Sequence, residues 1–158
     1  MDQFEELFQK YNCNLQDEQV KKEVEELLAD HYAENNTPEV YATCLSLIDL
    51  TSLNGTDTEE QIAAMTQKVN EFKTHFPALP NVGAICVYPS MVSVVKKNLV
   101  PKIGIASVAA GFPASQTFIE VKIAETSMAV MEGASEIDVV ISIGKFLTGR
   151  YGDVREEL

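Results

Sequence analysis

Apolar residues in the first 35 positions of the chain repeat with a helical period. Phe4, Leu7, Phe8 and Tyr11 occupy positions i, i+3, i+4 and i+7, which predicts a short helix with one apolar face. A second helix is predicted from Asp17 to about Ala33, and the apolar residues on one side of it are Val20, Val24, Leu27, Leu28 and Tyr32. Neither helix carries visible chemistry. We therefore interpret residues 1–39 as a helical extension that packs on the main body or at a subunit contact.

From Val40 onwards, β-branched apolar segments alternate with helical ones. Strands are predicted over residues 41–53, 82–88, 102–108 and about 136–143. Thr58 and Gln61 form a candidate capping box before one helix, and Thr117 and Glu120 form another before a helix that Gly133 ends. A short helix is predicted to begin at Pro89–Ser90. Residues 144–152 are predicted to form a loop, with Asp153 as the N-cap of a last helix.

This alternation of strands and helices predicts a parallel sheet with right-handed crossovers, an α/β fold. An open doubly wound sheet and a (β/α)8 TIM barrel both accept this order. The barrel is favoured because polar residues fall near the carboxyl ends of successive strands, where barrel active sites lie, and because no GxGxxG or P-loop motif is present. Residues 40–158 would then form about four of the eight units. A whole barrel needs roughly 250 residues, so we expect the sequence to be cut short.

The composition of the chain argues against several classes of function. The 158 residues are 46% hydrophobic, enough for a sizeable core, and the net charge is −12. The absence of a Lys/Arg cluster argues against nucleic-acid binding. No apolar run approaches the roughly 20 residues of a membrane span, and the N-terminus does not resemble a signal peptide. Three cysteines without a CxxC motif argue against a disulfide framework or a metal site and favour the cytoplasm.

One carboxylate interrupts the apolar segment 135–142. Strand alternation places Asp138 on one face with Val140 and Ser142, and three β-branched residues on the other. The more apolar face should meet the helices, so Asp138 should point into the barrel. A carboxylate in a buried strand must be paired or do chemistry. It could instead bind a structural cation or cap a loop.

Three further polar residues lie near the ends of predicted strands. Asp49 and Thr51 could be ordinary turn residues or could bind substrate hydroxyls. Cys86 could be a buried structural thiol or part of a pocket.

Five short motifs occur in the order and approximate spacing of the deoxyribose-phosphate aldolase family. They are Ile48–Thr51, Ala84–Pro89, Gly111–Pro113, Ala124–Thr126 and Glu136–Val140. Each motif is weak alone, but five in register are specific. The chain resembles this family over about residues 43–158.

The resemblance implies a class I aldolase on a (β/α)8 barrel. Such an enzyme reversibly cleaves 2-deoxy-D-ribose 5-phosphate to acetaldehyde and D-glyceraldehyde 3-phosphate through a lysine Schiff base, without metal or other cofactor. By the same resemblance, Asp138 matches a proton-relay carboxylate, whereas Asp49, Thr51 and Cys86 match residues of the substrate pocket. The implied partner is a small phosphorylated sugar, with no nucleic acid or membrane, and a homo-oligomer is compatible with it.

The sequence departs from the family at the nucleophile. The family's Schiff-base lysine, the lysine that lowers its pKa and the phosphate-binding residues all lie on later strands, and their motifs do not occur here. Lys102, Lys122 and Lys145 lack that context. We therefore expect this chain alone to be inactive. Two alternatives remain open: a non-catalytic half-barrel that pairs with another chain, and an unrelated open α/β interaction module.

Overall fold

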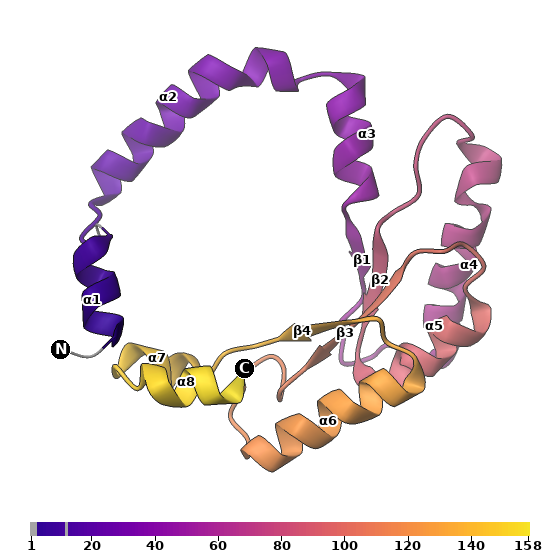
Figure 1. The fold of residues 1–158 in the computed structure, drawn as a ribbon. Helices are drawn as coiled ribbons and strands as arrows, with labels where there is room; N and C mark the ends of the chain where they lie inside the picture. Colours follow the sequence, from indigo (N-terminus) through magenta and orange to yellow (C-terminus); the bar gives the residue numbers. More distant parts are fainter. Residues whose placement is uncertain (1–2, 12) are drawn as a thin grey trace. The chain divides into compact units, whose positions relative to one another are not determined.

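The chain divides into two compact units, Met1–Tyr41 and Ala42–Leu158. The computed structural model describes residues 3–11 and 13–158 (Figure 1). Helices α1 (Gln3–Lys10) and α2 (Asp17–Asn35) lie in the first unit, as predicted. The predicted domain boundary after residue 39 stays a prediction, because a spatial division does not show that either part folds independently.

The prediction of a strand over residues 41–53 is wrong for most of its length. Helix α3 spans Pro38–Ser46, and β1 is confined to Asp49–Thr51. The side chain of Thr37 accepts a hydrogen bond from the backbone N–H of Val40 at 3.3 Å. Proline suits the first turn of a helix, since its fixed φ is helical and its missing N–H would be unpaired there anyway. The Thr37–Pro38 pair therefore starts a helix. The apolar residues of this segment had suggested a strand.

The second unit is built on a four-stranded parallel sheet in the order β1-β2-β3-β4 (Figure 1). Strand β2 spans Ala84–Val87, β3 spans Gly104–Ala109 and β4 spans Glu136–Val139. Strands β2 and β3 begin and end close to the predicted positions, whereas β4 is shorter than predicted. Neighbours in sequence are neighbours in the sheet, which is the arrangement of successive β/α units.

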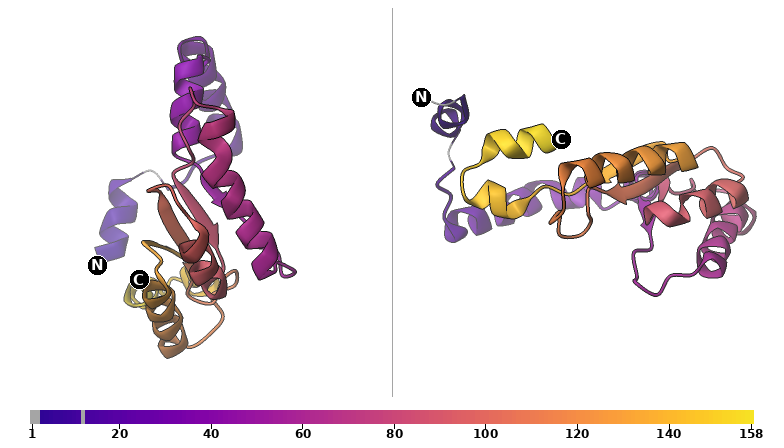
Figure 2. Two further views of the ribbon diagram at one scale, coloured as in Figure 1. Left: turned by 90° about the vertical axis from the view of Figure 1, so that its right-hand side faces the viewer. Right: turned by 90° about the horizontal axis from the view of Figure 1, so that it is seen from below.

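Helices cover one face of this sheet (Figure 2). They are α4 (Glu59–His75), the 3-10 turn η1 (Pro89–Met91), α5 (Val92–Asn98) and α6 (Ile119–Glu132). The main core lies between them and the strands, and its fully buried members include Ile62, Ile85, Val87, Val92 and Val95. The opposite face carries a smaller cluster of buried residues, namely Ala84, Cys86, Ala106 and Val108. The side chains on that face are mostly small, which leaves room for polar groups beside them.

One of the two predicted capping boxes forms. The Thr58 hydroxyl accepts from the Gln61 N–H at 3.3 Å, and the Gln61 side chain accepts from the Thr58 N–H at 2.9 Å. The box at Thr117 is wrong, because α6 takes Phe118 as its N-cap and Glu120 then lies one position too early to complete a box. The predicted helix end at Gly133 is confirmed by its left-handed φ of 114°.

The end of the chain is more helical than predicted. The predicted loop 144–152 contains most of α7 (Ile143–Leu147) and the start of α8 (Tyr151–Glu157), so Asp153 lies in the first turn and is not the N-cap. Strand β4 stops early because its partner β3 ends at Ala109, and the Val140 carbonyl accepts from the Ser115 hydroxyl at 3.0 Å. Among the helices described, none is both long and apolar enough to cross a membrane.

Candidate active site

The four residues singled out in the sequence lie on the same face of the sheet, opposite the helices. Thr51 is in register with Cys86, and Val108 with Asp138. Paired residues of parallel strands point the same way, and residues two apart on a strand share a face. Asp49, Thr51, Cys86 and Asp138 therefore share one surface, although 89 positions separate Asp49 from Asp138 (138 − 49). Asp138 faces away from the helices, as predicted.

The thiol of Cys86 connects two of these strands. Its Sγ lies 3.5 Å from Oδ2 of Asp138 and donates to it. Burial is the largest of the effects that raise the pKa of the Cys86 thiol to about 11, and the hydrogen bond to Asp138 and that residue's negative charge act in the same direction. The neighbouring Thr51 hydroxyl has the opposite effect, and the charge of Asp49 adds a small upward contribution. Cys86 is therefore a neutral donor facing a carboxylate at neutral pH.

The expected burial of the fourth strand is wrong. Asp138 is exposed, and so are Glu136 and Val139 in the same strand. Among the described strands, β4 pairs only with β3, so the side chains beyond it have no neighbouring strand to cover them. Ile137 alone packs against the helix-side core. Asp138 is consequently accessible to a solute in this chain and is not a charge sealed inside an apolar layer.

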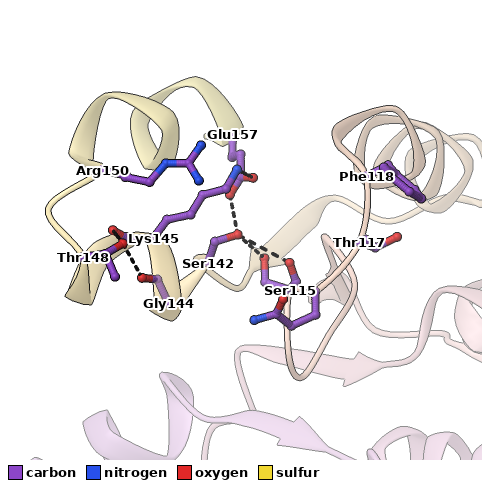
Figure 3. Close-up of a pocket in the computed structure, with 10 residues that line it drawn as sticks. Ser115, Thr117, Phe118, Ser142, Gly144, Lys145, Thr148, Arg150 and Glu157 are labelled. Atoms are coloured by element: carbon purple, nitrogen blue, oxygen red, sulfur yellow. Dashed lines mark hydrogen bonds and ion pairs between the residues drawn. The ribbon is translucent and has the colours of Figure 1, made fainter.

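The structure also contains a polar cluster that the sequence did not predict. Lys122 on α6 is 3% exposed, and its Nζ donates to the Ser115 hydroxyl at 2.7 Å and the Ser142 hydroxyl at 3.0 Å, as well as contacting Glu157 at 3.1 Å. Lys145 contacts the same carboxylate at 2.6 Å. Figure 3 shows Ser142 and Glu157 joined in this cluster. We call Ser115, Lys122, Ser142, Lys145 and Glu157 the Lys122 cluster.

The Lys122 cluster keeps its carboxylate ionised. Partial burial by itself raises the pKa of Glu157, but hydrogen bonds from Lys145, Ser142 and Lys122 outweigh it and lower the pKa to about 2. The Lys122 ammonium directs its three N–H bonds to three acceptors, which leaves no free amine to attack a carbonyl. One sequence signal was available, since Lys122 lies seven residues, about two helical turns, before the buried Ala129.

No group of three or more His, Cys, Asp or Glu side chains in the described part of the chain is arranged to hold a metal ion. The cationic side chains and hydroxyls near the ends of the strands suit anions and sugar hydroxyls instead.

The three cysteines should react very differently with iodoacetamide. At about pH 8 we expect Cys13 and Cys44, which are exposed, to be alkylated while Cys86 is spared, because only a thiolate reacts well and Cys86 has a raised pKa and 2% exposure. Mass spectrometry of the native protein should show two adducts, and three after unfolding in urea. Labelling of Cys86 should appear as the pH approaches 11. Equal rates for Cys86 and Cys44 at about pH 8 would contradict the geometry.

Comparison with known proteins shows that these residues lie in a segment shared with a family of aldolases. A family model described as DeoC/LacD family aldolase matches residues 43–146. The deoxyribose-phosphate aldolases of Homo sapiens and Bos taurus are 36% and 35% identical to the chain over 126 residues, and each match covers 72% of this chain and 39% of the relative. The chain thus spans about two fifths of the length of these curated relatives.

A solved structure described as QR15, an aldolase, is 27% identical, with a TM-score of 0.62 over 72% of this chain and 47% of that one. The similar solved structures are TIM-barrel aldolases, which confirms the predicted fold class. All four strands, and with them the four candidate site residues, lie inside the region that the family model matches.

Proposed function

Because this chain belongs to the DeoC/LacD family of aldolases, we propose that it contributes the Asp138 side of a deoxyribose-phosphate aldolase active site. The reaction is the reversible cleavage of 2-deoxy-D-ribose 5-phosphate to acetaldehyde and D-glyceraldehyde 3-phosphate. The observation that carries the proposal is the meeting of Asp49, Thr51, Cys86 and Asp138, from three strands, on the sheet face without helices. Barrel enzymes place their reacting groups toward the carboxyl ends of such strands.

Each of the four residues has a role that its contacts suit. Asp138 moves protons to and from the carbinolamine and the substrate carbon, since it is an exposed carboxylate with one oxygen toward Cys86. The neutral Cys86 thiol orients that carboxylate by donating to it. Thr51 and Asp49 bind substrate hydroxyls. The Thr51 hydroxyl donates to the Asp49 carbonyl at 2.8 Å and keeps its acceptor lone pairs for a ligand.

The nucleophile of the proposed reaction is a lysine outside residues 1–158. Schiff-base formation joins a neutral lysine amine to the substrate aldehyde and releases water. Lys122 and Lys145 are both engaged with Glu157, and we assign neither of them the role of nucleophile. The remainder of the site would be supplied by further chain or by a partner chain.

Borohydride trapping tests this assignment. The gene's full-length product, incubated with 2-deoxy-D-ribose 5-phosphate and sodium borohydride, should gain a reduced adduct on one lysine outside residues 1–158, because borohydride fixes the iminium as a stable amine. The 158-residue chain treated in the same way should gain none. Peptide mapping by mass spectrometry identifies the lysine. An active full-length enzyme without a trappable adduct, or an adduct on Lys122, would overturn the mechanism.

A second candidate function is a half-barrel that pairs with another chain. The exposed end of β4 favours it, since Val139 and the following Ile141 are 41% and 38% exposed, and no strand in the described part of the chain pairs with the outer edge of β4. Open strand edges invite pairing. Light scattering of the 158-residue chain distinguishes the two states: a dimer or larger species supports this function, whereas a well-folded monomer argues against it.

A further inference from the structure

A pocket of about 510 Å³ lies between the loop that follows β3 and helices α7 and α8 (Figure 3). Its polar lining includes Ser115, Thr117, Ser142, Lys145, Thr148 and Arg150. The two loops that form it follow β3 and β4, so the pocket lies beyond the carboxyl ends of those strands. None of the four candidate active-site residues lines it.

The charges around this pocket do not balance. Lys122 and Lys145 share the single carboxylate of Glu157, and Arg150 pairs with Asp153. Three cations against two carboxylates leave a surplus of one positive charge (3 − 2), although the whole chain carries −12. The positive charge is therefore confined to this part of the molecule, since the chain as a whole is negatively charged.

Hydrogen-bond donors remain available at the rim. The Lys145 ammonium has three N–H bonds, of which the contact with Glu157 uses one. The Arg150 guanidinium has five, and its pairing with Asp153 leaves several free. Lys145 is 33% exposed and Arg150 61% exposed, so both can reach a solute.

The floor of the pocket is held in place by buried contacts. Ser115 and Ser142 are 3% and 6% exposed, and both accept from the buried Lys122 ammonium. Ser115 has a φ of 55°, an uncommon left-handed conformation for a residue other than glycine. Because these side chains are already fixed, a ligand that binds here loses less free energy to ordering them.

We propose that this pocket binds a phosphate group, free or as the monoester of a small sugar. Phosphate matches the surplus positive charge, and its oxygens accept from Lys145, Arg150 and the hydroxyl of Thr117 at the rim. The site is separate from the Asp138–Cys86 pair. Its occupation does not depend on the proposed aldol cleavage.

Titration of the 158-residue chain with inorganic phosphate, followed by amide NMR at constant ionic strength, tests the proposal. Chloride serves as the reference anion, and deoxyribose 5-phosphate in a second titration distinguishes a free phosphate from a sugar phosphate. We expect saturable shifts confined to residues 115–118 and 142–150. The double variant K145Q/R150Q should weaken binding about tenfold or more, since it removes two charge-assisted donors.

Lys102→Gln is the matched control. It removes one positive charge from a different pocket, which lies at the amino ends of β2 and β3, so affinity for phosphate should change less than twofold. An equal loss in Lys102→Gln would mean that phosphate responds only to net charge. Either that result or the absence of saturable shifts in the wild-type chain would overturn the site. Borohydride trapping is unaffected by these outcomes, so the two proposals fail separately.

Discussion

Replacement of Lys122 by methionine should lower the free energy of unfolding by about 3 kcal/mol. Methionine keeps most of the apolar stem but removes the ammonium that Ser115, Ser142 and Glu157 all contact. The loss is large because Lys122 is 3% exposed and water cannot easily replace it. Urea denaturation followed by circular dichroism measures the change.

Lys145→Met is the matched control for that variant. Lys145 contacts the same carboxylate but is 33% exposed, so water can solvate what the substitution leaves behind. We expect a loss of about 1 kcal/mol or less. Equal losses for the two variants would show that burial of Lys122 contributes nothing beyond the ion pair itself.

Asp138→Asn should reduce turnover of the full-length enzyme by about 10²- to 10⁴-fold, the usual contribution of a positioned acid–base group. The expectation rests on the proposed role of Asp138 in moving protons. Steady-state cleavage of 2-deoxy-D-ribose 5-phosphate measures it. Full activity in the folded variant would remove Asp138 from the mechanism.

The same substitution has a second readout in the 158-residue chain. Asp138 raises the pKa of Cys86 both as hydrogen-bond acceptor and as a charge, so Asn should lower that pKa from about 11 toward 9.0. Alkylation of Cys86 should then begin at lower pH. Asp49→Asn is the control, because Asp49 acts on Cys86 through charge alone and as the smallest contribution. An unchanged alkylation profile in Asp138→Asn would contradict the contact between the two side chains.

Local sequence determined where several elements of the second unit begin or end. The box formed by Thr58 and Gln61 and the left-handed end at Gly133 depend on residues only a few positions apart, so their chemistry is visible in the sequence. The same holds for the strands that start near Ala84 and Gly104, since their β-branched runs are buried as expected. After Thr37–Pro38 the helix-starting residues and the apolar run favour different structures. The apolar pattern alone predicted a strand there, and the segment is a helix.

The shared face of Asp49, Thr51, Cys86 and Asp138 could be expected in part. Strand alternation indicates which side of each strand a residue occupies, and the motif register indicated which residues belonged together. The contact between Cys86 and Asp138 could not be derived, because it depends on the strand order and on their precise register across β3.

The sequence by itself determined the α/β class and the parallel direction of the strands, and its resemblance to a family indicated the residues of the candidate active site. The order of the strands came from the structure. The tertiary structure alone revealed the Lys122 cluster, because its members come from the β3–α6 loop, α6, the N-cap of α7, α7 itself and α8. A lysine on a helix is usually exposed, and the spacing of Lys122 from Ala129 does not by itself identify a partner for a buried cation. Lys122 becomes a buried cation only when a carboxylate 35 positions later (157 − 122) folds back to within 3.1 Å of it.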